Sequence, residues 1–254
     1  MQQPAQRDQT DPAPEELDFG PAPLPLRRLL PFAVVVLVLL ALGLVGTVGW
    51  RVYRASSPEF TLNDLNNSYA AFTTSSGTNE VSILTRDKFT EPPVEVGPER
   101  CSPLFQSTMA TQFPSRALDG VLVYSIGSDQ GGSMSLYTFR YTNARLARAD
   151  YDQVTTALPQ CRQVTVAMQD QQPRRMAVAP VEVTRDSGVR SQTAYLITRP
   201  DVSGRFSVHV LQFGNTVTWE YRYVSGSGEY SHQQAQELMD ALVAQMRDVL
   251  SIRS

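Results

Sequence analysis

Two cysteines are the residues of this chain whose types most readily support chemistry. Cys101 lies in the segment "VGPERCSPLF", and Cys161 lies sixty positions later in "LPQCRQ". Such a pair can form a disulfide, contribute to a metal site, supply a nucleophile or pack inertly in a core. A metal site needs three or four ligands, and neither His209 nor His232 stands at ligand spacing from a cysteine. The choice among the remaining roles depends on the compartment that the domain occupies.

The histidines give little support to a catalytic site. Nucleophilic hydrolysis needs a Ser or Cys beside a base, but His209 alternates with Leu211 and Phe213 in "FSVHVLQF", which favours a core or sheet-surface histidine. His232 falls in the first turn of a predicted helix, where we expect it to be solvated. No hydrolase, metalloprotease, phosphate-loop or dinucleotide motif is present, although acidic side chains distant in sequence could still pair in space. We therefore expect no catalytic residue, no metal and no cofactor.

Aromatic residues form rows that could contact a ligand. In two predicted strands, every second residue is aromatic, so the rings share one face of the strand. Most of these rings have an apolar body and a polar tip, which suits them to lining a cleft. Such rows more often pack under helices, so both interpretations stay open. The candidate cleft residues are Tyr137, Tyr141, Trp219, Tyr221, Tyr223 and His209, with Phe139 in the same row as the first two.

A long apolar segment predicts a membrane anchor. Residues 29–50, "LLPFAVVVLVLLALGLVGTVGW", contain no charged side chain and have arginines on both sides. At ~1.5 Å per residue they would cross a hydrocarbon core of ~30 Å, and no polar stripe marks them as a soluble helix. A cleaved signal peptide is the main rival, but its apolar region is shorter and begins sooner. We predict a single-pass transmembrane helix in which Gly43 and Thr47 form a small-residue pair.

The residues on either side of this segment suggest its orientation. Residues 1–28 are rich in Pro, Gln, Asp and Glu, as is typical of a disordered tail. The foldable residues and both cysteines follow the helix, so we predict a cytoplasmic tail, a linker over 51–60 and an extracytoplasmic domain over 61–254 at the cell membrane. Thr10, the only hydroxyl residue in the tail, is a candidate phosphorylation site.

Charge and composition narrow the class of protein. The net charge is −3 and no block of like charge occurs, which argues against a nucleic-acid partner. Of the 22 basic residues only Lys88 is lysine. This bias fits a GC-rich, actinobacterial genome.

The outer domain begins with predicted helix. Thr61 and Asp64 form a capping-box pattern at the start of a helix that ends near "SSGTNE". A weaker helical or irregular piece follows around residues 101–109. Period-two alternation in "LDGVLVYSIG" and "SMSLYTFRYT" then predicts a hairpin, followed by a helix over 144–158.

Strands crowd the last third of the chain. About five are predicted, and Gly214 and Asn215 form a two-residue loop between the last two. A capping box at Ser231 and Gln234 opens a final amphipathic helix. The order predicts the α+β class: an antiparallel sheet with helices packed on one face, preceded by one transmembrane helix.

The predicted compartment favours a disulfide. If the domain lies outside the cytoplasm, both cysteines stand where disulfides form and persist. A bridge between Cys101 and Cys161 would tie the end of the middle helix to the segment before the first hairpin. Two free thiols remain the alternative.

The residues around the cysteines resemble a known group. The run "VGPERCSPLF", a strand pair, then "ADYDQVTTALPQC" and a further strand is similar to extracytoplasmic sensor-type domains of mycobacterial membrane proteins and lipoproteins, among them the outer domain of a membrane Ser/Thr protein kinase. The resemblance covers roughly residues 80–250 and implies an antiparallel sheet flanked by helices that form a cleft. The tryptophan often found shortly before the second cysteine is missing here. A kinase function is not implied, because 28 tail residues cannot hold a kinase domain.

These patterns together predict a membrane-anchored, sensor-like protein of the cell envelope. Its outer domain would bind an unknown ligand or an envelope protein partner without catalysis. A structural or assembly subunit of a membrane complex is the first alternative, and a cell-wall hydrolase is the second.

Overall fold

The chain divides into two compact units, Met1–Val52 and Tyr53–Ser254. The computed structural model describes residues 35–36, 39–40, 58–76, 81–88, 94–105, 113–126, 133–168, 172–183, 191–201, 203–224 and 232–253. In the first unit these are four helical residues with exposed side chains. No helix within the described ranges is long and apolar enough to cross a membrane. The predicted tail with Thr10, and the predicted helix over 29–50 apart from those four residues, lie outside the described residues.

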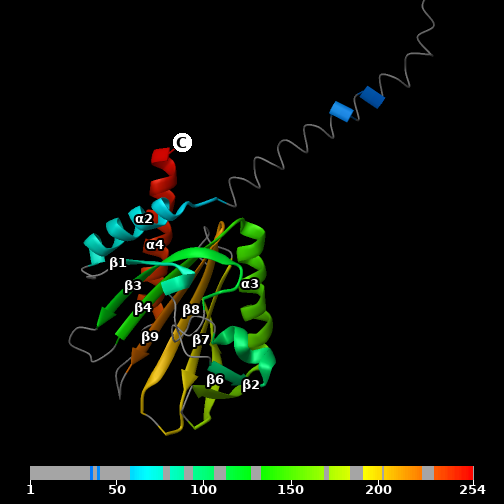
Figure 1. The fold of residues 1–254 in the computed structure, drawn as a ribbon, viewed down its shortest axis with the longest axis vertical. Helices are drawn as coiled ribbons and strands as arrows, with labels where there is room; N and C mark the ends of the chain where they lie inside the picture. Colours follow the sequence, from blue (N-terminus) through cyan, green and yellow to red (C-terminus); the bar gives the residue numbers. More distant parts are fainter. Residues whose placement is uncertain are drawn as a thin grey trace, which may run out of the picture. The chain divides into compact units, whose positions relative to one another are not determined.

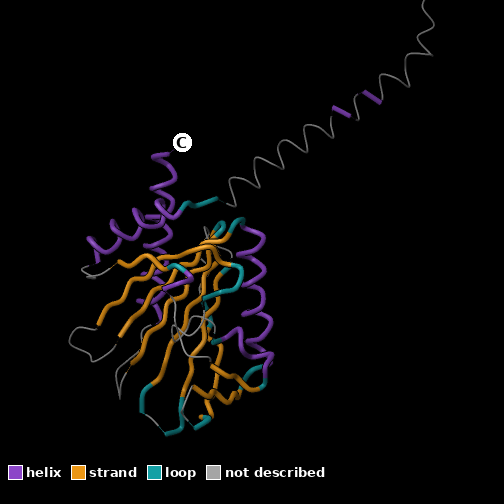
Figure 2. The backbone as a smooth tube through the Cα atoms, in the orientation of Figure 1, coloured by secondary structure: helices purple, strands orange, loops and turns teal. Residues whose placement is uncertain are grey.

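The second unit is built on one antiparallel sheet of nine strands (Figures 1 and 2). Every neighbouring pair is antiparallel, which the short connections between consecutive strands allow. In spatial order the strands are β1 (Val81–Leu84), β3 (Ala117–Ile126), β4 (Ser133–Tyr141), β9 (Thr216–Val224), β8 (Arg205–Phe213), β7 (Gln192–Thr198), β6 (Arg174–Val181), β5 (Gln163–Met168) and β2 (Val94–Gly97).

Helices cover both faces of this sheet. On one face, here the α4 face, α2 (Leu62–Ser76) and α4 (His232–Arg253) pack on each other and on strands from β3 to β8. On the other, the α3 face, lie α3 (Ala144–Ala157) and the short 3-10 helices η2 (Glu99–Leu104) and η3 (Leu158–Gln160). A further short helix is η1 (Arg86–Lys88). The prediction that the helices pack on one face is therefore wrong. Periodicity shows that a helix has an apolar side, but not which face of the sheet it covers.

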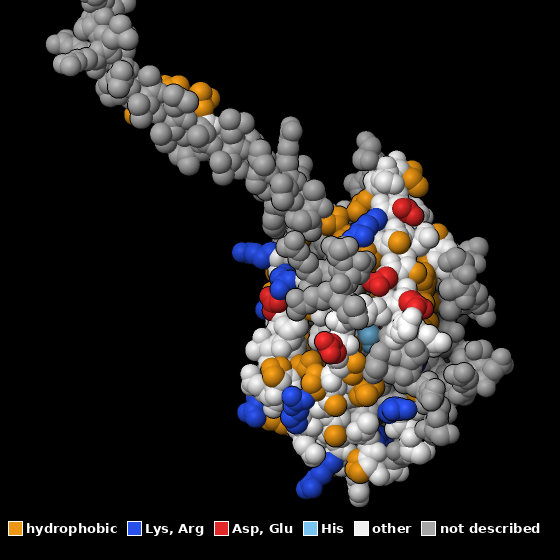
Figure 3. All heavy atoms as spheres, turned by 180° about the vertical axis from the view of Figure 1, so that it is seen from behind, with side chains coloured by type: hydrophobic (Ala, Val, Ile, Leu, Met, Phe, Trp, Pro, Cys, Tyr) orange, Lys and Arg blue, Asp and Glu red, His pale blue; other side chains and the backbone are white. Residues whose placement is uncertain are grey.

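Side chains of the central strands point alternately to the two faces of the sheet and pack into two separate hydrophobic cores. In β4, Tyr137, Phe139 and Tyr141 belong to the core under α3. Leu136 belongs to the core under α2 and α4, and Thr138 points to that same side, where it meets Tyr69 of α2. Because successive strand residues point to opposite faces, this division follows directly from the sequence. Seen from behind in Figure 3, the surface carries basic and acidic side chains with hydrophobic side chains exposed between them.

Capping interactions fix the starts of two helices. The Thr61 amide donates to Asp64 Oδ2 at 2.8 Å and the Asp64 amide donates to Thr61 Oγ1 at 3.2 Å, which confirms the predicted capping box of α2. At the start of α3 the Leu146 amide donates to Asn143 Oδ1 at 3.0 Å.

The turn between β8 and β9 also joins the start of α2 to the sheet. Gly214 has a φ of +58°, and a side chain there would collide with the Pro58 carbonyl. The Asn215 side chain accepts from the Phe60 amide at 2.7 Å and donates to the carbonyls of Phe60 and Tyr141 at 3.1 and 2.9 Å. The predicted two-residue loop is confirmed, and its asparagine satisfies buried backbone groups of two other segments.

Candidate functional site

The two cysteines form a disulfide. Cys101, in η2, is bonded to Cys161, just after η3, with a Cα–Cα distance of 5.7 Å. Both side chains are fully buried, so the bridge joins the two short helices at one end of α3. The disulfide prediction is confirmed. A cysteine nucleophile is excluded because no free cysteine remains, and the described residues hold no cluster of potential metal ligands.

The structure separates the six predicted cleft residues into three places. Tyr137 and Trp219 are directly paired across β4 and β9 on the α3 face, both almost fully buried. Tyr141 is buried on the same face, where its hydroxyl donates to Asp150 Oδ2 of α3 at 2.9 Å. His209 is 4% exposed and lies on the opposite, α4 face. His232 begins α4.

Only the two remaining tyrosines reach the surface, and they do so beside a phenylalanine. Tyr221 and Tyr223 of β9 are half-buried, as is Phe206 of β8. The Phe206 ring lies 5.2 Å from the Tyr221 ring, nearly parallel to it, and 4.9 Å from the Tyr223 ring. These three residues, here the aromatic patch, occupy the end of the α3 face at which β4 and β8 begin. Phe206 was not predicted as a site residue, because its position opposite Tyr223 depends on strand register.

The hydroxyl of Tyr221 distinguishes the patch from an ordinary core surface. It is buried, and no described residue hydrogen-bonds to it. Burial, together with Tyr137 and Tyr223, raises the pKa of this phenol well above its usual value, so it is a neutral donor at all ordinary pH values. Leaving such a group unsatisfied costs roughly 1–3 kcal/mol. A ligand acceptor that reached it would recover that cost.

The patch is shaped by glycine at its rim. Gly204, just before β8, lies so close to the ring of Tyr223 that any side chain there would collide with it. Nearby, Arg199 and Asp201 form an exposed ion pair in the turn between β7 and β8. The backbone of this turn therefore determines how the Tyr223 ring sits.

A buried polar layer lies on the other side of the same strands. Hydroxyl groups of Tyr69, Thr138 and Thr218 form a chain of hydrogen bonds across the α4 face. Further along β9, Arg222 Nη2 donates to Glu220 Oε1 at 2.8 Å, while Glu220 Oε2 has no partner among the described residues. Burial raises the pKa of Glu220 to about 7 despite the attraction of Arg222. The three hydroxyl groups and the Glu220 carboxylate are enclosed, so we assign them to the interior of the fold rather than to contact with a ligand.

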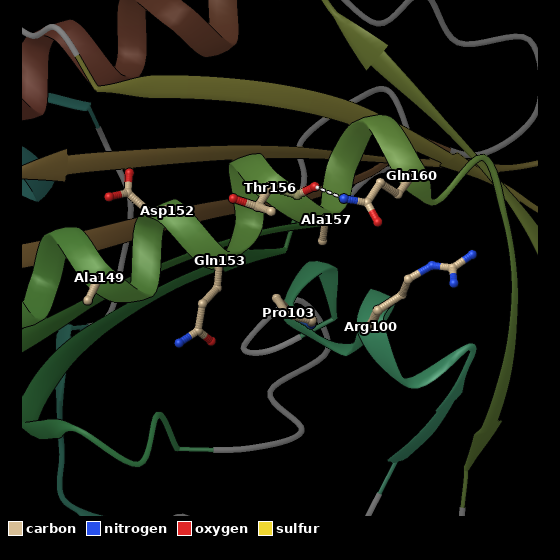
Figure 4. Close-up of a pocket in the computed structure, with 8 residues that line it drawn as sticks. All are labelled: Arg100, Pro103, Ala149, Asp152, Gln153, Thr156, Ala157 and Gln160. Carbon is tan, nitrogen blue, oxygen red and sulfur yellow. Dashed lines mark hydrogen bonds between the residues drawn. The ribbon is translucent and has the colours of Figure 1, made fainter.

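A separate groove of about 380 Å³ runs between α3 and η2 (Figure 4). Gln153 and Thr156 lie on the α3 side, and Gln160 follows in η3. Arg100 and Pro103 lie on the η2 side. Sequence reasoning did not find this groove, because no pattern in either segment indicates that they lie side by side.

Comparison with known proteins identifies the fold. No protein-family model matches the sequence, and no curated protein matches it. Among solved structures, the chain is similar to the extracellular domain of PknH from Mycobacterium tuberculosis, with a TM-score of 0.55 and 13% sequence identity over 76% of this chain and 99% of that domain. Over the matched part, the chain shares that fold. The resemblance expected from the sequence is confirmed at this level. A putative uncharacterized protein of Mycobacterium smegmatis, an Rv0999 ortholog, has a TM-score of 0.43 at 16% identity over 75% of this chain and 98% of its own.

Proposed function

We propose that the chain is a single-pass membrane protein of the cell envelope whose outer domain binds a ligand without catalysing a reaction. The uncharged segment over 29–50 supports the anchor. The disulfide supports an oxidising location, and the fold is one that an extracellular domain uses. In this proposal the tail over 1–28 is cytoplasmic and residues 61–254 are outside.

The aromatic patch carries the binding part of the proposal. Phe206, Tyr221 and Tyr223 present three contiguous, half-exposed rings above a buried donor that no described residue satisfies. Rings of this kind supply apolar contact, and a polar tip fixes orientation. The matching ligand has a flat apolar face and an edge that accepts a hydrogen bond, as sugar rings and aromatic compounds do.

The two alternatives gain less support from the described residues. An assembly subunit should expose a continuous apolar patch. Among the exposed large hydrophobic residues of the described second unit, Ile83 and Leu118 lie on the neighbouring strands β1 and β3, and Ile252 lies apart from them in sequence on α4. A hydrolase that used His209 as its base would need that side chain to face solvent, and it is buried. Neither observation favours a second function over binding.

Thermal unfolding of the full chain in lipid nanodiscs tests the proposal. The probes are a panel of mono- and disaccharides and of aromatic amino-acid derivatives. We expect at least one to raise the melting temperature of the wild type but not of Phe206→Ala, while Ile83→Ala, a control on an exposed edge strand, keeps the response. If no probe distinguishes the wild type from Phe206→Ala, the patch is not a binding site for these classes.

A further inference from the structure

We propose that the groove between α3 and η2 binds an extended peptide segment that carries a carboxylate, independently of the aromatic patch. Its volume of about 380 Å³ lies within the ~300–1,000 Å³ typical of ligand sites. Three features of its walls support this assignment: their rigidity, their amide-bearing side chains and the positive charge at the Arg100 end.

Both walls are fixed before any ligand arrives. The disulfide joins Cys101 of η2 to Cys161 at the end of η3, so the two sides of the groove are covalently linked. The other end of η2 is held by the hydroxyl of Tyr195 in β7, which donates to the buried Leu104 carbonyl at 2.6 Å. A groove with rigid walls loses little conformational entropy when it is occupied, which favours binding.

The α3 wall offers groups that pair with peptide bonds. Ala149, Gln153 and Thr156 follow one another at spacings of four and three, which places them on one side of α3, and Gln160 follows in η3. Gln160 Nε2 donates to the Thr156 carbonyl at 3.3 Å, so its Oε1 remains as an acceptor. In Figure 4 the Gln153 side chain extends away from α3, on the side of the helix where Pro103 lies. Carboxamides donate and accept at once, as a peptide unit requires.

Small side chains between these groups let a backbone approach. Ala157 of α3 lies opposite Pro103 of η2, and Ala149 lines the groove further along α3 (Figure 4). None of them projects far enough to hold an extended chain away from the carboxamides. We therefore expect the occupant to have small side chains of its own.

The groove lining holds one basic and one acidic side chain, Arg100 and Asp152, and its positive charge lies at the Arg100 end. Arg100 is exposed and forms no ion pair within the described residues. The only acid in the lining, Asp152, is paired with Arg148 at 2.9 Å, and in Figure 4 its carboxylate points away from η2. The Arg100 guanidinium lies toward Gln160, at the opposite end from Asp152. A carboxylate of the bound peptide at that end would accept a charge-assisted hydrogen bond from the Arg100 guanidinium.

Saturation-transfer NMR on the full chain in nanodiscs tests this proposal. The probes are N-acetyl-trialanine with a free carboxylate, its C-terminal amide and sodium acetate. We expect the free acid to bind about three- to five-fold more tightly than the amide at low salt, as one exposed ion pair permits. Arg100→Gln should abolish that preference, and Gln153→Ala should weaken both peptides. Arg145→Gln, an equal change of charge on the exposed first turn of α3, should alter neither.

Three results would overturn the proposal. One is the absence of peptide binding to the wild type, and another is a preference for the free acid that survives in Arg100→Gln. The third is competition by acetate alone as strong as that by acetyl-trialanine, which would mean that only the carboxylate is recognised. Phe206→Ala should leave peptide binding unchanged, so the outcome is independent of the proposed function at the aromatic patch.

Discussion

Glu220 lies directly opposite His209 across the β8–β9 ladder, and the two side chains are only 1% and 4% exposed on the α4 face. Arg222, two residues along β9, donates one hydrogen bond to the Glu220 carboxylate. A carboxyl group this deep in a sheet must affect how stability depends on pH. Burying a charge is costly unless it is paired and fully hydrogen-bonded.

We predict that the domain loses stability as the pH rises from 4.5 to 7. Burial raises the folded-state pKa of Glu220 from 4.5 to about 7. Between these values the folded state keeps a proton that the unfolded state releases, so the stabilising contribution is complete below pH 4.5 and is lost as the pH passes about 7. The difference of about 2.5 between the two pKa values corresponds to on the order of 3 kcal/mol. Urea unfolding across this range measures it.

Glu220→Gln isolates this contribution. The variant should be close to the wild type at pH 4.5 and more stable at pH 7.5, because a neutral amide carries no charge into the core. Glu95→Gln, the same change on an exposed residue of β2, is the matched control. His209→Gln measures what the neighbouring imidazole adds. An unchanged pH slope in Glu220→Gln would show that Glu220 does not titrate in this range.

The disulfide should account for a large part of the stability of the second unit, Tyr53–Ser254. A bridge that spans 60 residues restricts the unfolded chain by about 4 kcal/mol in the chain-entropy model. We therefore expect the Cys101→Ser, Cys161→Ser double variant to lose stability of this order in urea unfolding. Reduced wild type should match it. A loss below about 1 kcal/mol would mean that the bridge adds little beyond the packing around it.

Asn215 should contribute more to the stability of the fold than an ordinary turn residue does. Truncation to Ala would leave the Phe60 amide and two buried carbonyls without their partners, at about 1–3 kcal/mol for each buried group left unsatisfied. We expect Asn215→Ala to cost at least about 3 kcal/mol in chemical unfolding, the sum of the lowest values for the three groups. Asn143→Ala removes only the helix cap of α3 and should cost about 1 kcal/mol. Equal losses in the two variants would argue against the bridging role of Asn215.

Two tyrosines test whether a buried hydroxyl is satisfied. The Tyr195 hydroxyl donates to the Leu104 carbonyl, whereas that of Tyr221 has no partner among the described residues. Tyr195→Phe should therefore destabilise the domain by about 1–3 kcal/mol, and Tyr221→Phe should be neutral or slightly stabilising. The shift in the urea midpoint of each variant relative to the wild type measures both effects. A loss in Tyr221→Phe as large as that in Tyr195→Phe would mean that its hydroxyl is already bonded.

Much of the fold follows from local patterns in the sequence. The capping pair Thr61 and Asp64, the hairpin of β3 and β4, and the two faces of β4 were all predictable, because each depends on residues close together in the chain. The edge strands β1 and β2 were not predicted, since each has only four residues, which is too short for alternation to stand out. The distribution of helices over both faces depends on contacts between distant segments, which periodicity does not encode.

In the candidate sites, too, the residues that depend on local patterns were predictable, and those that depend on contacts between distant segments were not. Tyr221 and Tyr223 could be named from alternation alone, but Phe206 joins them only through the β8–β9 register. Tyr137 and Trp219 carry the same pattern and are buried instead, because alternation assigns a face without saying how much of it is covered. Arg100 gave no sequence signal, since the groove exists only when η2 packs beside α3.

The state of Cys101 and Cys161 in intact cells tests the central claim most directly. A membrane-impermeant and a permeant thiol reagent, each adding mass, would be applied to cells that produce the full chain, before and after reduction. We predict that neither reagent modifies the chain until it is reduced, and that the impermeant reagent then labels both cysteines after unfolding at the cell surface. Free reaction of both thiols with the permeant reagent alone, without reduction, would place the domain in the cytoplasm and contradict the account.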